Sequence, residues 1–141
     1  MMDHLILNES MRVGHAQVDA EHAILIGIVN QCVDLVAASA TAEEFHEVLA
    51  DLRSKLIEHI AIEETILLEL GYLDMEGERK EHRDGLVRLN QLIEQCREGV
   101  DLEMLLREIT GLLLLIFIKS DMSFKSFLQS IDYRDDATAS V

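Results

Sequence analysis

Histidine and carboxylate side chains recur along the chain at spacings that suit a metal site. His59 and Glu63 are four residues apart, and so are Glu78 and His82. In a helix this spacing places both members of a pair on one side, one turn apart. Imidazoles and carboxylates on facing helices are how di-iron and di-manganese sites are built. The full set of candidate metal ligands is His22, His59, Glu63, Glu78, His82 and Asp121.

Each candidate ligand lies on the apolar face of a segment with helical periodicity. His22 shares its face with Leu25 and Val29, and Asp121 shares its face with Phe124. Burying such a polar group without a partner costs about 1–3 kcal/mol or more. Any one of them alone is best explained as a core histidine or a surface pair. Together, however, they would leave several polar groups and clustered negative charges inside the protein, so cations between the helices are expected.

Four segments with helical periodicity must position these residues. They run over about residues 19–38, 42–70, 77–98 and 101–129. Thr41 followed by Glu44 has the spacing of a capping box at the start of the second segment. Gly71 and Gly99 are expected to end the second and third segments. Because the chain contains no proline and few aromatic residues, the fold class is predicted to be all-α.

Short connections between long helices favour antiparallel neighbours. The expected architecture is therefore an up-down-up-down antiparallel four-helix bundle over residues 19–130. Residues 1–18 are expected to form an N-terminal arm, and residues 131–141 a C-terminal tail.

Composition excludes several classes of partner. The chain has 141 residues, with 27 Asp and Glu against 12 Lys and Arg, which gives a formal net charge of −15. Nucleic acids and anionic membranes are poor partners for such a chain, because both attract basic surfaces. Cys32 and Cys96 have no metal-binding or redox spacing, and residues 1–13 are not expected to be a secretory leader. Two reduced thiols in a cytoplasmic protein are the expectation.

The most hydrophobic stretch, Leu112–Ile118, contains seven consecutive apolar residues. It is far shorter than the roughly 20 residues that a membrane-spanning helix needs. Leu112 and Leu115 are expected to point away from the face of Asp121. They would either lie under the N-terminal arm or form the seam of a homodimer.

From about Val13 to Leu128 the sequence resembles the hemerythrin family, in particular its bacterial single-domain members. VGHAQVDAEH, ending at His22, is similar to the start of the family's first helix, and HIAIEE, beginning at His59, to its His-x-x-x-Glu motif. GYLDM, beginning at Gly71, resembles its turn between the second and third helices. The resemblance implies a four-helix bundle that holds two non-haem irons joined by an oxo or hydroxo bridge.

Transferred position by position, the resemblance assigns a role to most candidate ligands. His22 and His59 would bind one iron, and His82 would bind the other. Glu63 and Asp121 would bridge the two irons.

Two positions depart from the family pattern. Glu78 stands where the family's third helix has the first histidine of His-x-x-x-His, and Ile116 stands where its fourth helix has the histidine of His-x-x-x-x-Asp. The resulting set of three histidines and three carboxylates should favour ferric iron or admit manganese, and it leaves one metal with room for an exogenous molecule. His15 is a further residue that could replace the missing ligand, although a packing role is favoured.

Three classes of function follow. The carboxylate-enriched site favours a protein that binds and reacts with a small molecule such as O2, NO or H2O2, with oxidase, peroxidase or NO-reducing activity as the enzymatic form. Reversible O2 binding, sensing or storage is the function that the family resemblance implies. A hemerythrin fold without metal, acting as an interaction module, is the third class, and Ile116 is the residue that favours it.

Overall fold

The structure, a computed structural model, describes residues 2–6 and 12–134, with the side chains of Ser120 and Asp121 left outside the description. Within these ranges the chain forms four α-helices and one short 3-10 turn, and no strand. The elements are α1 (Ala16–Ala37), α2 (Ala42–Glu69), α3 (Met75–Gln95), η2 (Cys96–Glu98) and α4 (Leu102–Ser130). The all-α fold class is confirmed.

Local capping accounts for where the helices begin. α1 begins at Ala16, three residues before the expected start, because Nδ1 of His15 accepts a hydrogen bond from the backbone N–H of Val18 at 3.4 Å. The predicted cap of α2 is confirmed, since Oγ1 of Thr41 accepts from the N–H of Glu44 at 3.1 Å. At the end of α2 the backbone of Gly71 has a φ of 84°, a conformation that glycine adopts without strain.

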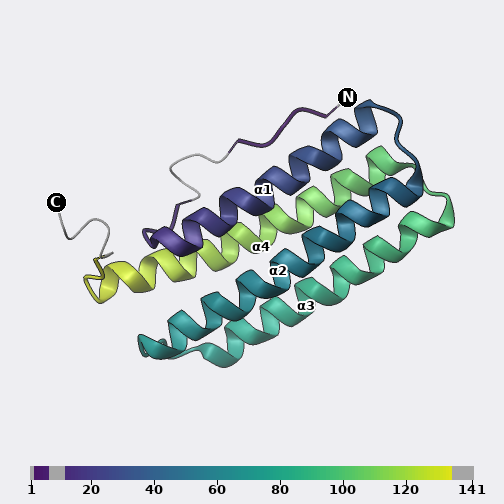
Figure 1. The fold of residues 1–141 in the computed structure, drawn as a ribbon. Helices are drawn as coiled ribbons and strands as arrows, with labels where there is room; N and C mark the ends of the chain where they lie inside the picture. The colour runs from purple at the N-terminus through teal and green to yellow at the C-terminus, as the bar shows by residue number, and fades with distance from the viewer. Residues whose placement is uncertain (1, 7–11, 135–141) are drawn as a thin grey trace.

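The four helices lie lengthwise beside one another, with the connections between them at the two ends of the molecule (Figure 1). α2 packs against both α1 and α3, and α3 packs against α4. This arrangement turns the apolar stripes of all four helices inward.

The buried apolar residues form a main cluster and a smaller cluster. Four of the described candidate ligands lie between the two along their helices, and His59 lies at the edge of the main cluster, next to Ile60. On α1, His22 lies between Val18 of the smaller cluster and Leu25 of the main one. Likewise, Glu63 on α2 and His82 on α3 each lie between a residue of the smaller cluster and a residue of the main one. The polar residues therefore form one layer that crosses the interior of the molecule.

By length and composition alone, α1 could cross a membrane. The same composition suits a core helix, and α1 has its apolar face inside this fold, where Val18, Leu25 and Val29 are each at most 1% exposed.

The described part of the N-terminal segment lies along α1. The backbone N–H of Leu5 donates to Oδ1 of Asn30 at 2.7 Å, and the side-chain amide of Asn30 donates to the carbonyl of Leu5 at 2.9 Å. Residues 2–6 therefore contact α1. Leu112 packs at the edge of the main core and is half-buried, whereas Leu115 is 52% exposed. The homodimer seam stays a prediction, with Leu115 as its more accessible member.

Candidate metal centre

Three helices bring five polar side chains together in the interior. Each of these side chains is at most 4% exposed. Their ligand atoms fall into two groups, and within each group the atoms lie within 4.8 Å of one another. The first group is His22, His59 and Glu63, and the second is Glu63, Glu78 and His82. The sixth predicted ligand, Asp121, lies on α4, and its side chain falls outside the described residues.

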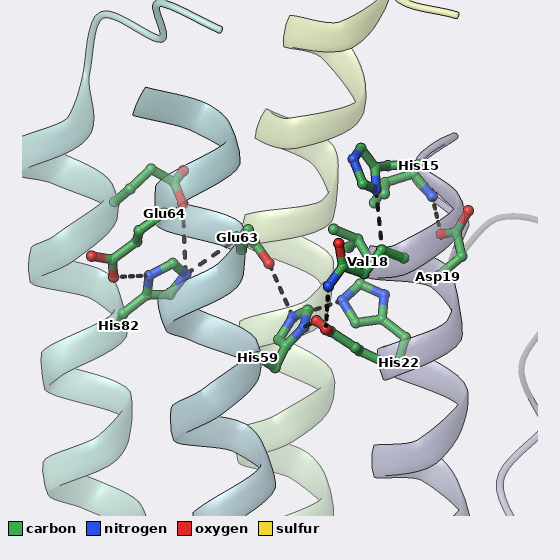
Figure 2. Close-up of polar contacts among 12 residues, drawn as sticks. His15, Val18, Asp19, His22, His59, Glu63, Glu64 and His82 are labelled. Carbon is green, nitrogen blue, oxygen red and sulfur yellow. Dashed lines mark hydrogen bonds and ion pairs between the residues drawn. The ribbon is translucent and has the colours of Figure 1, made fainter. Parts of the chain in front are cut away.

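Glu63 belongs to both groups and lies between them (Figure 2). Its Oε2 is 3.0 Å from Nε2 of His59, and its Oε1 is 3.8 Å from Nε2 of His82. One carboxylate therefore presents a different oxygen to each group, which is the geometry of a carboxylate that bridges two cations.

The remaining contacts also direct donor atoms inward. Nε2 of His22 lies 3.1 Å from Nε2 of His59, so the two rings face the same point. Oε2 of Glu78 lies 3.7 Å from Nε2 of His82. In the absence of a cation, the Nε2–H of one ring donates a hydrogen bond to Nε2 of the other, whereas with a cation both nitrogens can act as ligands.

Two carboxylates outside the two ligand groups contact histidine rings at Nδ1, the nitrogen on the far side of the ring from the candidate centre. Nδ1 of His59 lies 2.8 Å from Oε1 of Glu21, and Nδ1 of His82 lies 2.8 Å from Oε2 of Glu64. With the proton on Nδ1, the lone pair of each ring is on Nε2, which faces the interior. Glu21 and Glu64 adjoin candidate ligands in the sequence and point about 100° away from them. Folding places each one on a histidine of a neighbouring helix.

The interior charges are poorly compensated by the protein itself. Burial raises the pKa of Glu78 from 4.5 to about 7, and the negative charge of nearby Glu63 adds to the effect. Burial lowers the pKa of His59, but hydrogen bonds to Glu63 and Glu21 and their charges outweigh it, so that this pKa is raised. Oε2 of Glu78 is buried without a hydrogen-bond partner among the described residues. These residues fit a cation, because a positive ion would satisfy this oxygen and offset the carboxylate charges.

Ile116 lies beside the His82 side of the centre. Its side chain is half-buried and packs against Gly85 of α3, where a Cβ atom would come within 2.7 Å of Cδ1 of Ile116. A cavity between α3 and α4 is lined by Ile116, Gly85 and His82. Ile116 is thus an apolar side chain that lines the same cavity as the candidate ligand His82.

The structure gives His15 a role in packing and capping. Its ring stacks on Tyr133 with centroids 5.6 Å apart and meets Phe124 edge-on at 6.3 Å. Its Nδ1 is engaged by the N–H of Val18 at the start of α1 (Figure 2). His15 is in neither of the two ligand groups.

The sequence patterns did not identify Phe117 and Gly85 as neighbours of the candidate ligands. The ring of Phe117 lies 4.9 Å from that of His22 and covers it on the α4 side. The feature that could have indicated Phe117 is its position next to Ile116, within the apolar run of α4. Gly85 carries no such signal, because a glycine within a helix becomes informative only when the residue that packs against it is known.

Comparison of the chain with protein-family models, with curated proteins and with solved structures finds no match. What the centre can do must therefore follow from its own residues. Two neighbouring groups of buried nitrogen and oxygen donors that share one carboxylate could hold a pair of cations.

Proposed function

We propose that this chain is a hemerythrin-like protein that holds two non-haem iron ions, with manganese as an alternative metal, and that binds and reacts with a small molecule such as O2, NO or H2O2. The observation that carries the proposal is the position of Glu63, whose two oxygens face histidines of two different helices. The proposal includes an up-down-up-down order of the helices, which the short connections at residues 38–41 and 70–74 support.

In this proposal His22 and His59 bind one ion, and Glu78 and His82 bind the other. Glu63 and Asp121 of α4 would be the two carboxylates shared by both ions. When bound, the iron ions supply one-electron redox chemistry and positions for a small molecule. The protein orients the imidazoles through Glu21 and Glu64 and keeps the centre away from water, since every described ligand is at most 4% exposed.

The ligand set favours reaction over reversible carriage. Glu78 adds a hard oxygen donor on the side where the hemerythrin family has imidazoles. Carboxylates stabilise the higher oxidation state of iron, so a reduced centre should be oxidised by its ligand instead of releasing it unchanged. Reversible O2 binding and a metal-free interaction module are the alternatives that the following experiment separates.

The test is elemental analysis of the protein purified from iron-replete cells, together with its optical spectrum. We expect a metal pair in each chain and rapid conversion to a ferric species in air, with turnover of peroxide or NO when an external electron donor is supplied. A stable charge-transfer band on aeration that disappears under vacuum would instead establish reversible O2 carriage. Metal well below one ion per chain would overturn both forms of the proposal.

Substitutions of single carboxylates test which residues bind the metal. Glu63→Gln removes the shared charge and should lower the content of both ions, because it changes the one residue common to both groups. Glu69→Gln, on the exposed surface of the same helix, is the matched control and should retain both.

A further inference from the structure

The outer face of α4 is more apolar than that of any other helix. Among the described residues, α4 carries four exposed large hydrophobic side chains, whereas α1, α2 and α3 carry at most two each. The exposed fractions are 66% for Met104, 52% for Leu115, 55% for Ile118 and 66% for Met122. A single exposed apolar residue is normal in a soluble protein, but a row of them on one helix marks a contact site for another molecule.

These four residues follow the spacing of a coiled-coil seam. Together with Glu108 and Gly111 they are separated by alternating steps of four and three residues along α4. At about 100° per residue, all six positions fall within about 80° of the helix surface. We call this set the outer seam, and it comprises Met104, Glu108, Gly111, Leu115, Ile118 and Met122. α4 thus has one apolar stripe that faces its own bundle and a second one that faces outward.

The outer seam keeps the same pattern of positions when the direction of the helix is reversed. Reversal exchanges Met104 with Met122, Glu108 with Ile118, and Gly111 with Leu115. Two antiparallel copies of α4 can therefore place the leucine of each copy over the glycine of the other. A Cβ atom at Gly111 would meet nothing within 4 Å, so the space beside it is open to a side chain of another copy. Glycine inside a helix costs about 1 kcal/mol relative to alanine, and the close approach of a second helix is a packing reason for its presence here.

The charges beside the outer seam favour the antiparallel direction. Lys119 is exposed, follows Ile118 and lies about three helical turns after Glu108. In an antiparallel pair, Glu108 of each copy faces Lys119 of the other, so the contact forms twice. In a parallel pair, Glu108 would face a second Glu108 and Gly111 a second glycine, which leaves like charges together and a gap between the helices. Arg88 of α3 lies 3.9 Å from Glu108 and adds a second cation beside this carboxylate.

We propose that the outer seam of α4 is the interface of a homodimer, in which two copies of α4 pack antiparallel about a two-fold axis between Gly111 and Leu115. A second copy of this chain is the partner because the outer seam is complementary to itself in shape and in charge. The net charge of −15 on each chain opposes association, but at physiological ionic strength this repulsion is screened beyond about 8 Å. The contact needs no metal, so it stands independently of the proposed function.

The first test is sedimentation of the full chain over a range of micromolar concentrations. The wild type should form dimers, and Leu115→Glu should raise the dissociation constant by about thirtyfold or more, because it buries a charge at the centre of the outer seam. Ile24→Glu is the matched control, since it adds the same charge at a residue of α1 that is 53% exposed, against 52% for Leu115. It should leave the dimer intact. A wild type that stays monomeric, or equal dissociation constants for the two variants, would overturn the proposal.

The second test establishes the direction of the paired helices by crosslinking. Met104→Cys and Met122→Cys proteins are treated with a short bismaleimide, separately and as an equimolar mixture. Cys32 and Cys96 are at most 1% exposed and should not react. Only the mixture should give a crosslinked pair, because residues 104 and 122 of different copies meet in the antiparallel dimer, whereas two copies of the same residue lie about 27 Å apart. Crosslinking within either variant alone would contradict the antiparallel direction, and the lack of crosslinks in all three samples would rule out the outer seam as the interface.

Discussion

Oε2 of Glu64 lies 2.8 Å from Nδ1 of His82, on the side of the ring opposite the interior. Nε2 of the same ring faces Glu63 and Glu78 at 3.8 and 3.7 Å. The carboxylate on the outer nitrogen fixes both the orientation of the ring and the position of its proton, so that the lone pair of the inner nitrogen is directed toward the interior. Glu64 is therefore a positioning residue for the His82 side of the centre.

Substitution Glu64→Gln should weaken metal binding on the His82 side by about ten- to a hundredfold. Glutamine keeps an oxygen acceptor but loses the negative charge that makes the imidazole a stronger ligand. Competition between the protein and a chelator measures the affinity of each ion. Glu69→Gln on the same helix is the control, and equal affinities in the two variants would contradict the role of Glu64.

Substitution Ile116→His should produce a more typical hemerythrin optical spectrum in the iron-loaded protein. Ile116 lines the cavity that reaches His82, so an imidazole at this position can supply the ligand that the proposed centre lacks. The comparison is the ligand-field and charge-transfer region of the two ferric proteins at equal iron content. An unchanged spectrum would mean that position 116 does not face the metals.

Substitution Glu78→Gln should stabilise the metal-free protein at high pH. The pKa of Glu78 is about 7 in the folded protein against 4.5 for an ordinary glutamate, so the fold favours the protonated carboxyl. Stability is therefore fully present below pH 4.5 and declines as the pH rises through 7. The ionised carboxylate then costs at most about 3 kcal/mol, which the neutral amide avoids.

Urea unfolding of the metal-free proteins at pH 5 and pH 8 checks this expectation. The variant should exceed the wild type in free energy of unfolding at the higher pH, with a much smaller difference at the lower pH. Glu76→Gln, exposed in the first turn of the same helix, should show no such dependence. In the metal-loaded proteins the order should reverse, because Glu78 then compensates a cation.

Substitution His15→Ala should destabilise the protein by about 1 kcal/mol without changing its metal content. The change removes the acceptor for the N–H of Val18 and the stacking on Tyr133. His15→Asn, which keeps a good N-cap, should lose less stability. Thermal unfolding and elemental analysis of both variants are the measurements, and a loss of metal in either one would make His15 a ligand.

The sequence alone predicted where the four helices lie in the chain and which residues share one face of a helix. Apolar periodicity placed all four helices to within three residues at each end, because a helical repeat depends on neighbours in the chain. The same local geometry put Glu78 and His82 on one face of α3. What periodicity could not show was that α1 begins at Ala16, because the N-cap is His15, whose ring caps Val18 and also packs against Phe124 and Tyr133 from the other end of the chain.

Only the tertiary structure decided how the helices combine their side chains. It pairs Glu21 with His59 across 38 residues, directs the two oxygens of Glu63 toward different histidines, and sets Ile116 against Gly85. Each of these relationships depends on the rotation and axial register of one helix against another. Interhelical packing determines both quantities, whereas the spacing of residues within one helix determines neither.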